Sequence, residues 1–175
     1  MISLFSCKNE KEEAVELFTK EVKKVKIWSY PARGLWDVKD GKERQGIKIL
    51  NNKIQLDTTK IIDNVELNDN QKKELFALLK NDICGISGTH AACYIPRHLI
   101  LFYDENEKLI GFYEFCIECG GSVESENLKN IPAFCIEKGN EMEQLLKGFG
   151  LKITSDKSLE IKEIEKELGK QLLGK

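Results

Sequence analysis

Two nearly continuous apolar segments joined by a short polar loop most constrain the fold of this chain. The segments cover residues 96–103 and 109–116, and residues 104–107 read Asp-Glu-Asn-Glu. Runs of this kind, rich in β-branched and aromatic residues, predict an antiparallel β-hairpin. A loop at 104–107 pairs residues whose numbers sum to 211, which places Arg97 opposite Glu114. We therefore expect a central 96–116 hairpin whose register is supported by this opposite-charge pair.

Helical patterns lie on both sides of the hairpin. Four segments carry apolar residues at spacings of three and four: 10–24, 68–81, 140–149 and 159–173. Asn68 and Gln71 have the spacing of a capping box, and Gly150 is a usual stop after a helix. Extended segments are expected at residues 26–30 and on both sides of Asn51-Asn52. Helices interleaved with antiparallel hairpins predict an α+β fold, an antiparallel sheet packed with three to four helices.

Composition excludes several classes of protein. The chain of 175 residues has 27 basic and 29 acidic side chains, interspersed to a net charge of −2, unlike the basic surface of a nucleic-acid-binding protein. No apolar run approaches the roughly 18 residues that a membrane-spanning helix needs. The phosphate-loop, dinucleotide, serine-hydrolase and zinc-protease motifs are absent from the sequence. A single domain without catalytic activity is therefore the primary interpretation.

The first seven residues predict a membrane anchor. Leu4-Phe5-Ser6-Cys7 resembles the lipobox of bacterial lipoproteins, in which the cysteine becomes the lipidated N-terminus, and a charged stretch follows it. We therefore expect residues 1–7 to be the remnant of a signal segment, residues 8–175 to form one α+β domain, and Cys7 to hold the protein at the bacterial cell envelope. The alternative is a cytoplasmic protein in which Cys7 is a small apolar residue of a first strand or terminus.

The cysteines form the most informative cluster for function. Six of the eight cysteines and histidines fall between positions 84 and 119. In the predicted register Cys93 lies opposite Glu118, so it approaches both Cys116 and Cys119. His98 lies opposite Tyr113, roughly 10 Å along the strand from Cys116 at about 3.3 Å per residue, which is too far to share one metal ion. The candidate site is the set Cys93, Cys116 and Cys119, with Cys84 and His90 on the preceding loop as further members.

Three chemistries fit this cluster. In the oxidising envelope, one or two disulfides would staple the hairpin base to the preceding loop, which is the interpretation we favour. A zinc-like soft-metal site would use the same thiolates, although a C-x-x-C with a lone third cysteine is only half of such a motif. A thiol–disulfide redox protein would use Cys116-x-x-Cys119, but Gly120-Gly121 stands where a helix should begin, and Glu118 would disfavour the thiolate.

The same segment also carries a resemblance. Residues Cys93-Tyr94-Ile95-Pro96-Arg97-His98, the following strand and Phe115-Cys116-Ile117-Glu118-Cys119 are similar to a C-[YF]-x-P-R-H, strand, C-x-x-C pattern of small bacterial envelope lipoproteins of the Bacteroidetes type. The resemblance spans residues 84–149. It implies an exported α+β domain and no particular activity, with the membrane as partner through the lipid anchor.

Overall fold

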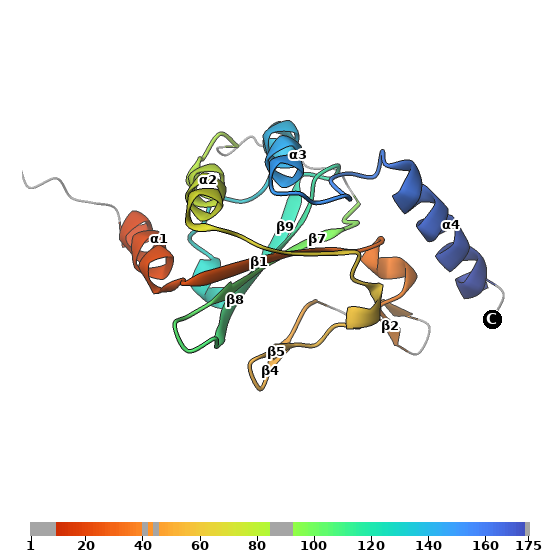
Figure 1. Cartoon of the computed structure of the whole chain (residues 1–175), viewed down its shortest axis with the longest axis horizontal. Helices are drawn as coiled ribbons and strands as arrows, with labels where there is room; N and C mark the ends of the chain where they lie inside the picture. Colours follow the sequence, from red (N-terminus) through yellow and green to blue (C-terminus); the bar gives the residue numbers. More distant parts are fainter. Residues whose placement is uncertain (1–9, 40–41, 44–45, 85–92, 174–175) are drawn as a thin grey trace, which may run out of the picture.

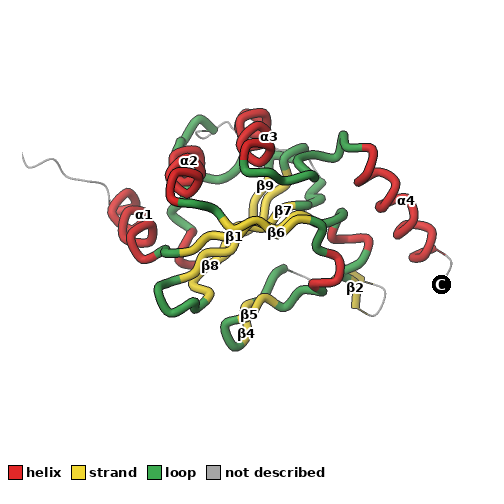
Figure 2. The backbone as a smooth tube through the Cα atoms, in the orientation of Figure 1, coloured by secondary structure: helices red, strands yellow, loops and turns green. Residues whose placement is uncertain are grey.

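A five-stranded antiparallel sheet forms the centre of the molecule, which confirms the predicted α+β fold (Figures 1 and 2). The computed structural model describes residues 10–39, 42–43, 46–84 and 93–173. The strand order is β6-β1-β7-β8-β9, with the predicted hairpin at its centre. The strands are β1 (Lys24–Ser29), β6 (Asp63–Glu66), β7 (His98–Tyr103), β8 (Leu109–Cys116) and β9 (Gly121–Glu124).

Helices cover one face of this sheet. Three of them, α1 (Glu10–Glu21), α2 (Asp69–Lys80) and α3 (Gly139–Gly148), lie on the same side, while α4 (Leu159–Leu173) lies beyond the end of the sheet (Figure 1). The capping box at the start of α2 is present: Asn68 Oδ1 accepts from Gln71 N at 3.0 Å, and Gln71 Oε1 accepts from Asn68 N at 2.9 Å. The helix-covered face buries the larger apolar core, which includes Phe18, Leu75, Phe102, Phe115 and Met142.

The opposite face is covered by the segment between β1 and β6. This segment contains the short strand pairs β2 (Val38–Lys39) with β3 (Lys42–Glu43) and β4 (Ile49–Leu50) with β5 (Lys53–Ile54), and the 3-10 turns η1 (Arg33–Leu35) and η2 (Thr58–Lys60). Asn51 and Asn52 form the predicted turn at φ values of 50° and 59°. A second apolar cluster fills the space between this covering segment and the sheet: Tyr30, Ile47, Leu99, Leu101, Leu109 and Phe112.

The register of the central hairpin differs from the predicted one. Leu99 lies opposite Glu114, so paired residue numbers sum to 213 instead of 211, and a bulge between Phe102 and Tyr103 accounts for part of the shift. The predicted pairing of Arg97 with Glu114 is therefore wrong. A shift of two residues leaves every side chain on the same face of the sheet, so the apolar alternation of the strands does not distinguish the two registers.

A buried aspartate fixes the segment between α3 and α4 to the sheet. Asp63, the first residue of the unpredicted strand β6, accepts hydrogen bonds at its Oδ2 from Ser29 Oγ at 2.6 Å, from Lys152 N at 3.1 Å and from Ile153 N at 3.0 Å. His98 Nε2 lies 3.0 Å from the carbonyl oxygen of Ile153. These contacts place the segment that precedes α4 beside the start of β7 and therefore near the cysteines that flank the hairpin.

Candidate functional site

Three cysteine sulfurs meet at the open end of the central hairpin. Cys93 precedes β7, and Cys116 and Cys119 bracket the turn that follows β8. Because β7 and β8 are antiparallel neighbours, the residues before the first strand and after the second lie side by side. The convergence of Cys93 with the Cys116-x-x-Cys119 segment that the sequence predicts is therefore present, although the register is shifted by two residues.

Cys116 and Cys119 form a disulfide within the turn. Their Cα atoms are 5.2 Å apart, and both side chains are buried. Two backbone amides point at the sulfurs: Cys119 N donates to Cys116 Sγ at 3.2 Å, and Ile95 N donates to Cys119 Sγ at 3.4 Å. Gly120 continues the turn at a φ of 64°, a conformation that glycine adopts without steric cost. The bond joins residues three positions apart and does not staple the hairpin to the preceding loop.

Cys93 is a free and exposed thiol beside this disulfide. Its Sγ lies 3.9 Å from Cys119 Sγ. The prediction that Cys93 takes part in a disulfide staple is therefore wrong for this structure. A thiol in contact with a disulfide sulfur is the starting arrangement for thiol–disulfide exchange, in which a thiolate attacks one sulfur and expels the other.

A second disulfide supplies the long-range staple instead. Cys84, after α2, is bonded to Cys135, which precedes the 3-10 turn η5 (Ile136–Lys138) and α3. The two residues are 51 positions apart in sequence, and both are buried. Cys84 therefore does not belong to the sulfur cluster around Cys93. The other two predicted members of the sites, Cys7 and His90, lie outside the described residues.

Charged side chains surround the Cys116–Cys119 turn. Glu118 Oε2 lies 3.8 Å from Cys116 Sγ and 3.6 Å from Arg97 Nη1. Arg97 also forms a bidentate ion pair with Glu165 of α4: Arg97 Nε lies 2.8 Å from Oε1, and Arg97 Nη2 lies 2.9 Å from Oε2. Planar pairing of this kind is the geometry that guanidinium and carboxylate groups favour. The partner of Arg97 is thus Glu165, which lies too far away in sequence for the hairpin pattern to indicate it.

Glu114, the predicted partner of Arg97, belongs to a separate buried network. Its carboxylate lies 2.9 Å from Arg33 Nε and accepts hydrogen bonds from Tyr30 at 2.7 Å and from Tyr94 at 3.2 Å. Burial raises the pKa of Glu114, while Arg33 and the two tyrosines act against this rise. Arg33 also pairs with Asp37 at 3.0 Å. Tyr94, the residue after Cys93, is therefore connected through this network to the interior of the sheet face that the segment between β1 and β6 covers.

His98 is buried in the sheet, but it lies opposite Phe115 and not opposite Tyr113, so the predicted distance of three positions along the strand from Cys116 is wrong. Its ring stacks on Phe115 with centroids 5.3 Å apart, and its Nε2 contacts the Ile153 carbonyl. Burial lowers the pKa of His98 to about 4. Within the described ranges, no three His, Cys, Asp or Glu side chains gather in a way that could hold a metal ion.

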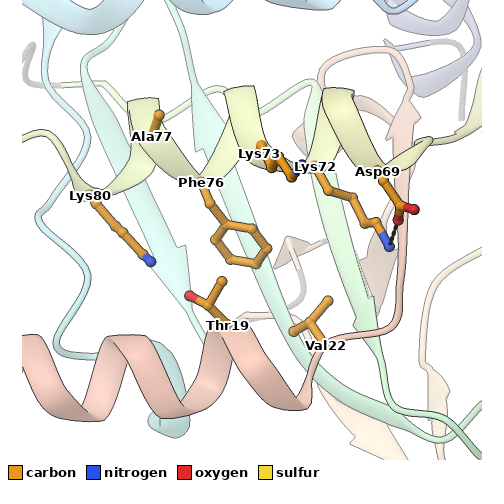
Figure 3. Close-up of a pocket in the computed structure, with 8 residues that line it drawn as sticks. All are labelled: Thr19, Val22, Asp69, Lys72, Lys73, Phe76, Ala77 and Lys80. Carbon is orange, nitrogen blue, oxygen red and sulfur yellow. Dashed lines mark ion pairs between the residues drawn. The ribbon is translucent and has the colours of Figure 1, made fainter.

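A groove between α1 and α2 is a further concave feature (Figure 3). Its volume is about 500 Å³, and lysines of α2 border an apolar floor that includes Phe76 and Val22. Lys72 donates to Lys23 O at 2.7 Å and pairs with Asp69 at 2.8 Å. Since Lys72 is engaged within the fold, the cysteine cluster is the better candidate site.

Comparison with known proteins returns no relative. No protein family model matches the chain, and neither a curated protein nor a solved structure matches it. In the part of the chain that the structure describes, no helix is long and apolar enough to cross a membrane.

Proposed function

We propose that this protein is a thiol–disulfide exchange protein in which Cys93 transfers disulfides between external reactants and the Cys116–Cys119 pair. The observation that carries the proposal is the 3.9 Å separation between the free Cys93 sulfur and Cys119 Sγ. The other two sulfurs are buried and only Cys93 is exposed. An exposed thiol beside a buried disulfide can carry the bond in either direction between that pair and an external reactant.

The chemistry balances within the three cysteines. The thiolate of Cys93 attacks Cys119 Sγ, a Cys93–Cys119 bond forms, and the Cys116–Cys119 bond breaks. The electron pair of the broken bond remains on Cys116, which takes up one proton, while Cys93 has given its proton to water. The internal step therefore moves a disulfide without a net oxidation, and its reverse regenerates the starting pair.

The reactants that fit this arrangement are protein or small-molecule thiols and disulfides. With all three cysteines reduced, the thiolate of Cys93 attacks an external disulfide and forms a mixed disulfide with one half of it, while the other half leaves with the electron pair and becomes a thiol. Cys119 then attacks the Cys93 sulfur, which releases the reduced reactant and leaves a Cys93–Cys119 bond. Attack of Cys116 on Cys119 finally stores the disulfide in the buried pair and frees Cys93 for another cycle.

Two single substitutions test this relay. In the reduced Cys116→Ser variant, oxidised glutathione should first modify Cys93, and Cys119 should then displace the glutathione to give a Cys93–Cys119 disulfide. In the matched Cys119→Ser variant, Cys116 is the thiol of this cluster that remains beside Cys93, and glutathione should stay on Cys93. Peptide mapping by mass spectrometry measures both products. Glutathione that persists on Cys93 equally in both variants would contradict the relay, and a stoichiometric metal in the purified wild-type protein would favour the soft-metal alternative.

We further propose that the protein acts at the bacterial cell envelope, anchored by lipid on Cys7. The similarity of Leu4-Phe5-Ser6-Cys7 to a lipobox supports this, as does the use of two disulfides, which persist in oxidising compartments. The natural protein should therefore partition with membranes and carry acyl chains on Cys7, measured by fractionation and mass spectrometry. Recovery from the cytosol with an unmodified Cys7 would contradict the anchor.

A further inference from the structure

Glu118 contacts Cys116, whose sulfur is the leaving group when Cys93 attacks Cys119 in the proposed exchange. Its Oε2 atom lies 3.8 Å from Cys116 Sγ. Its other oxygen, Oε1, accepts a hydrogen bond from Asp156 N at 2.6 Å, and Arg97 lies on the Oε2 side. The carboxylate is therefore held from two directions, and its side chain does not need to rearrange to meet a thiol at Cys116.

The surroundings of Cys116 favour a thiol over a thiolate. The side chain of Cys116 is only 1% exposed, and burial opposes the charged form of a sulfur. Arg97 carries a positive charge on this side, but Glu118, Glu165 and Asp156 all act on it, so these four groups together carry more negative than positive charge. Glu114, two residues earlier on β8, is paired with Arg33. The Cys119 amide is the group that would stabilise a thiolate, at 3.2 Å from the sulfur.

We propose that Glu118 is a positioning residue that holds the released Cys116 as a thiol and so prolongs the life of the Cys93–Cys119 disulfide. This inference rests on the proposed exchange. Return of the disulfide to the buried pair requires the thiolate of Cys116, and a thiol that donates a hydrogen bond to a carboxylate is a poor nucleophile. The delay keeps the disulfide at the exposed Cys93, where an external dithiol can take it. Glu118 thus favours donation of the disulfide outward.

The substitution Glu118→Gln removes the negative charge of the Glu118 side chain while keeping its size and its hydrogen bond with Asp156. The Gln amide oxygen can still accept from Asp156 N, while its NH₂ group can donate to the sulfur of Cys116 and favour the thiolate. In the reduced Cys119→Ser protein, we expect Glu118→Gln to increase the alkylation rate of Cys116 at neutral pH by about tenfold, the factor equal to one pKa unit. The pH profile of that reaction should move to lower pH. Glu118→Ala provides a second variant with the same expected direction.

The matched control is Glu167→Gln, which removes a carboxylate of α4 that pairs with Lys170. We expect this variant to leave the alkylation rate of Cys116 unchanged. Alkylation of Cys116 is followed by peptide mapping of the full-length protein, so other thiols do not contribute. An unchanged rate and pH profile in Glu118→Gln and Glu118→Ala would overturn the role of Glu118. Failure of Cys93 and Cys119 to form a disulfide would instead overturn the proposed exchange, because the Cys116 alkylation experiment does not require Cys93 to react.

Discussion

Replacement of Cys84 and Cys135 by alanine should lower the free energy of unfolding by about 4 kcal/mol. The disulfide closes a loop between residues 51 positions apart, so it restricts the unfolded chain strongly. It also joins the end of α2 to the segment that enters α3, the two helices that share the larger core. Urea unfolding of the oxidised wild type and of the double variant, followed by circular dichroism, measures the difference.

The Cys116–Cys119 disulfide supplies the matched comparison. Its residues are only three positions apart, and the same chain-entropy relation gives about 2 kcal/mol for so short a loop. We therefore expect Cys116→Ala/Cys119→Ala to cost roughly half as much stability as the loss of Cys84–Cys135. Equal losses from the two pairs would contradict the assignment of Cys84–Cys135 as the structural staple and of Cys116–Cys119 as the exchanging pair.

Acidification should destabilise the protein through His98. The pKa of His98 is about 4 in the folded protein and about 6.5 in an unfolded chain, so between these values the unfolded state binds the proton. Stability is therefore complete above pH 6.5 and declines as the pH falls toward 4, by about 3 kcal/mol at the lower limit. Protonation would also place a second N–H group in a buried position, since Nδ1 has no hydrogen-bond partner among the described residues.

The variant His98→Gln isolates this contribution. Its amide can still donate to the Ile153 carbonyl, but it does not titrate. Carboxylates contribute equally to the pH dependence of both proteins, so the difference in unfolding free energy between pH 7 and pH 4 should be about 3 kcal/mol smaller in His98→Gln. Urea unfolding at the two pH values measures this change. The same pH dependence in both proteins would show that His98 is not the group responsible.

Elements with strong local signals could be predicted from the sequence. The last helix begins at Leu159 and ends at Leu173 as its apolar spacing indicates, and Asn68 with Gln71 caps α2 because their spacing fits the first turn of a helix. The hairpin was recognisable from its two apolar runs. The strands β6 and β9 were missed because each has only four residues, with few apolar side chains, at an edge of the sheet.

The features that depend on distant contacts could not be predicted in the same way. The hairpin register differs from the predicted one by two residues because the turn is more complex than a simple four-residue loop: Asp104 Oδ1 accepts from the amides of Asn106 and Lys108, and Glu107 has a φ of 59°. Cysteine connectivity does not follow from sequence alone. The partner of Arg97 lies on α4, 68 positions away, so no local pattern indicates that pair.

The central claim is that the free thiol of Cys93 exchanges with the Cys116–Cys119 disulfide. The most direct test incubates the wild-type protein at neutral pH in a glutathione redox buffer, traps its thiols with N-ethylmaleimide and maps the disulfides by mass spectrometry. We predict two populations, one with Cys116–Cys119 and one with Cys93–Cys119, and an unchanged Cys84–Cys135 bond in both. A single population in which Cys93 is always trapped as a thiol and Cys119 is always bonded to Cys116 would contradict the account.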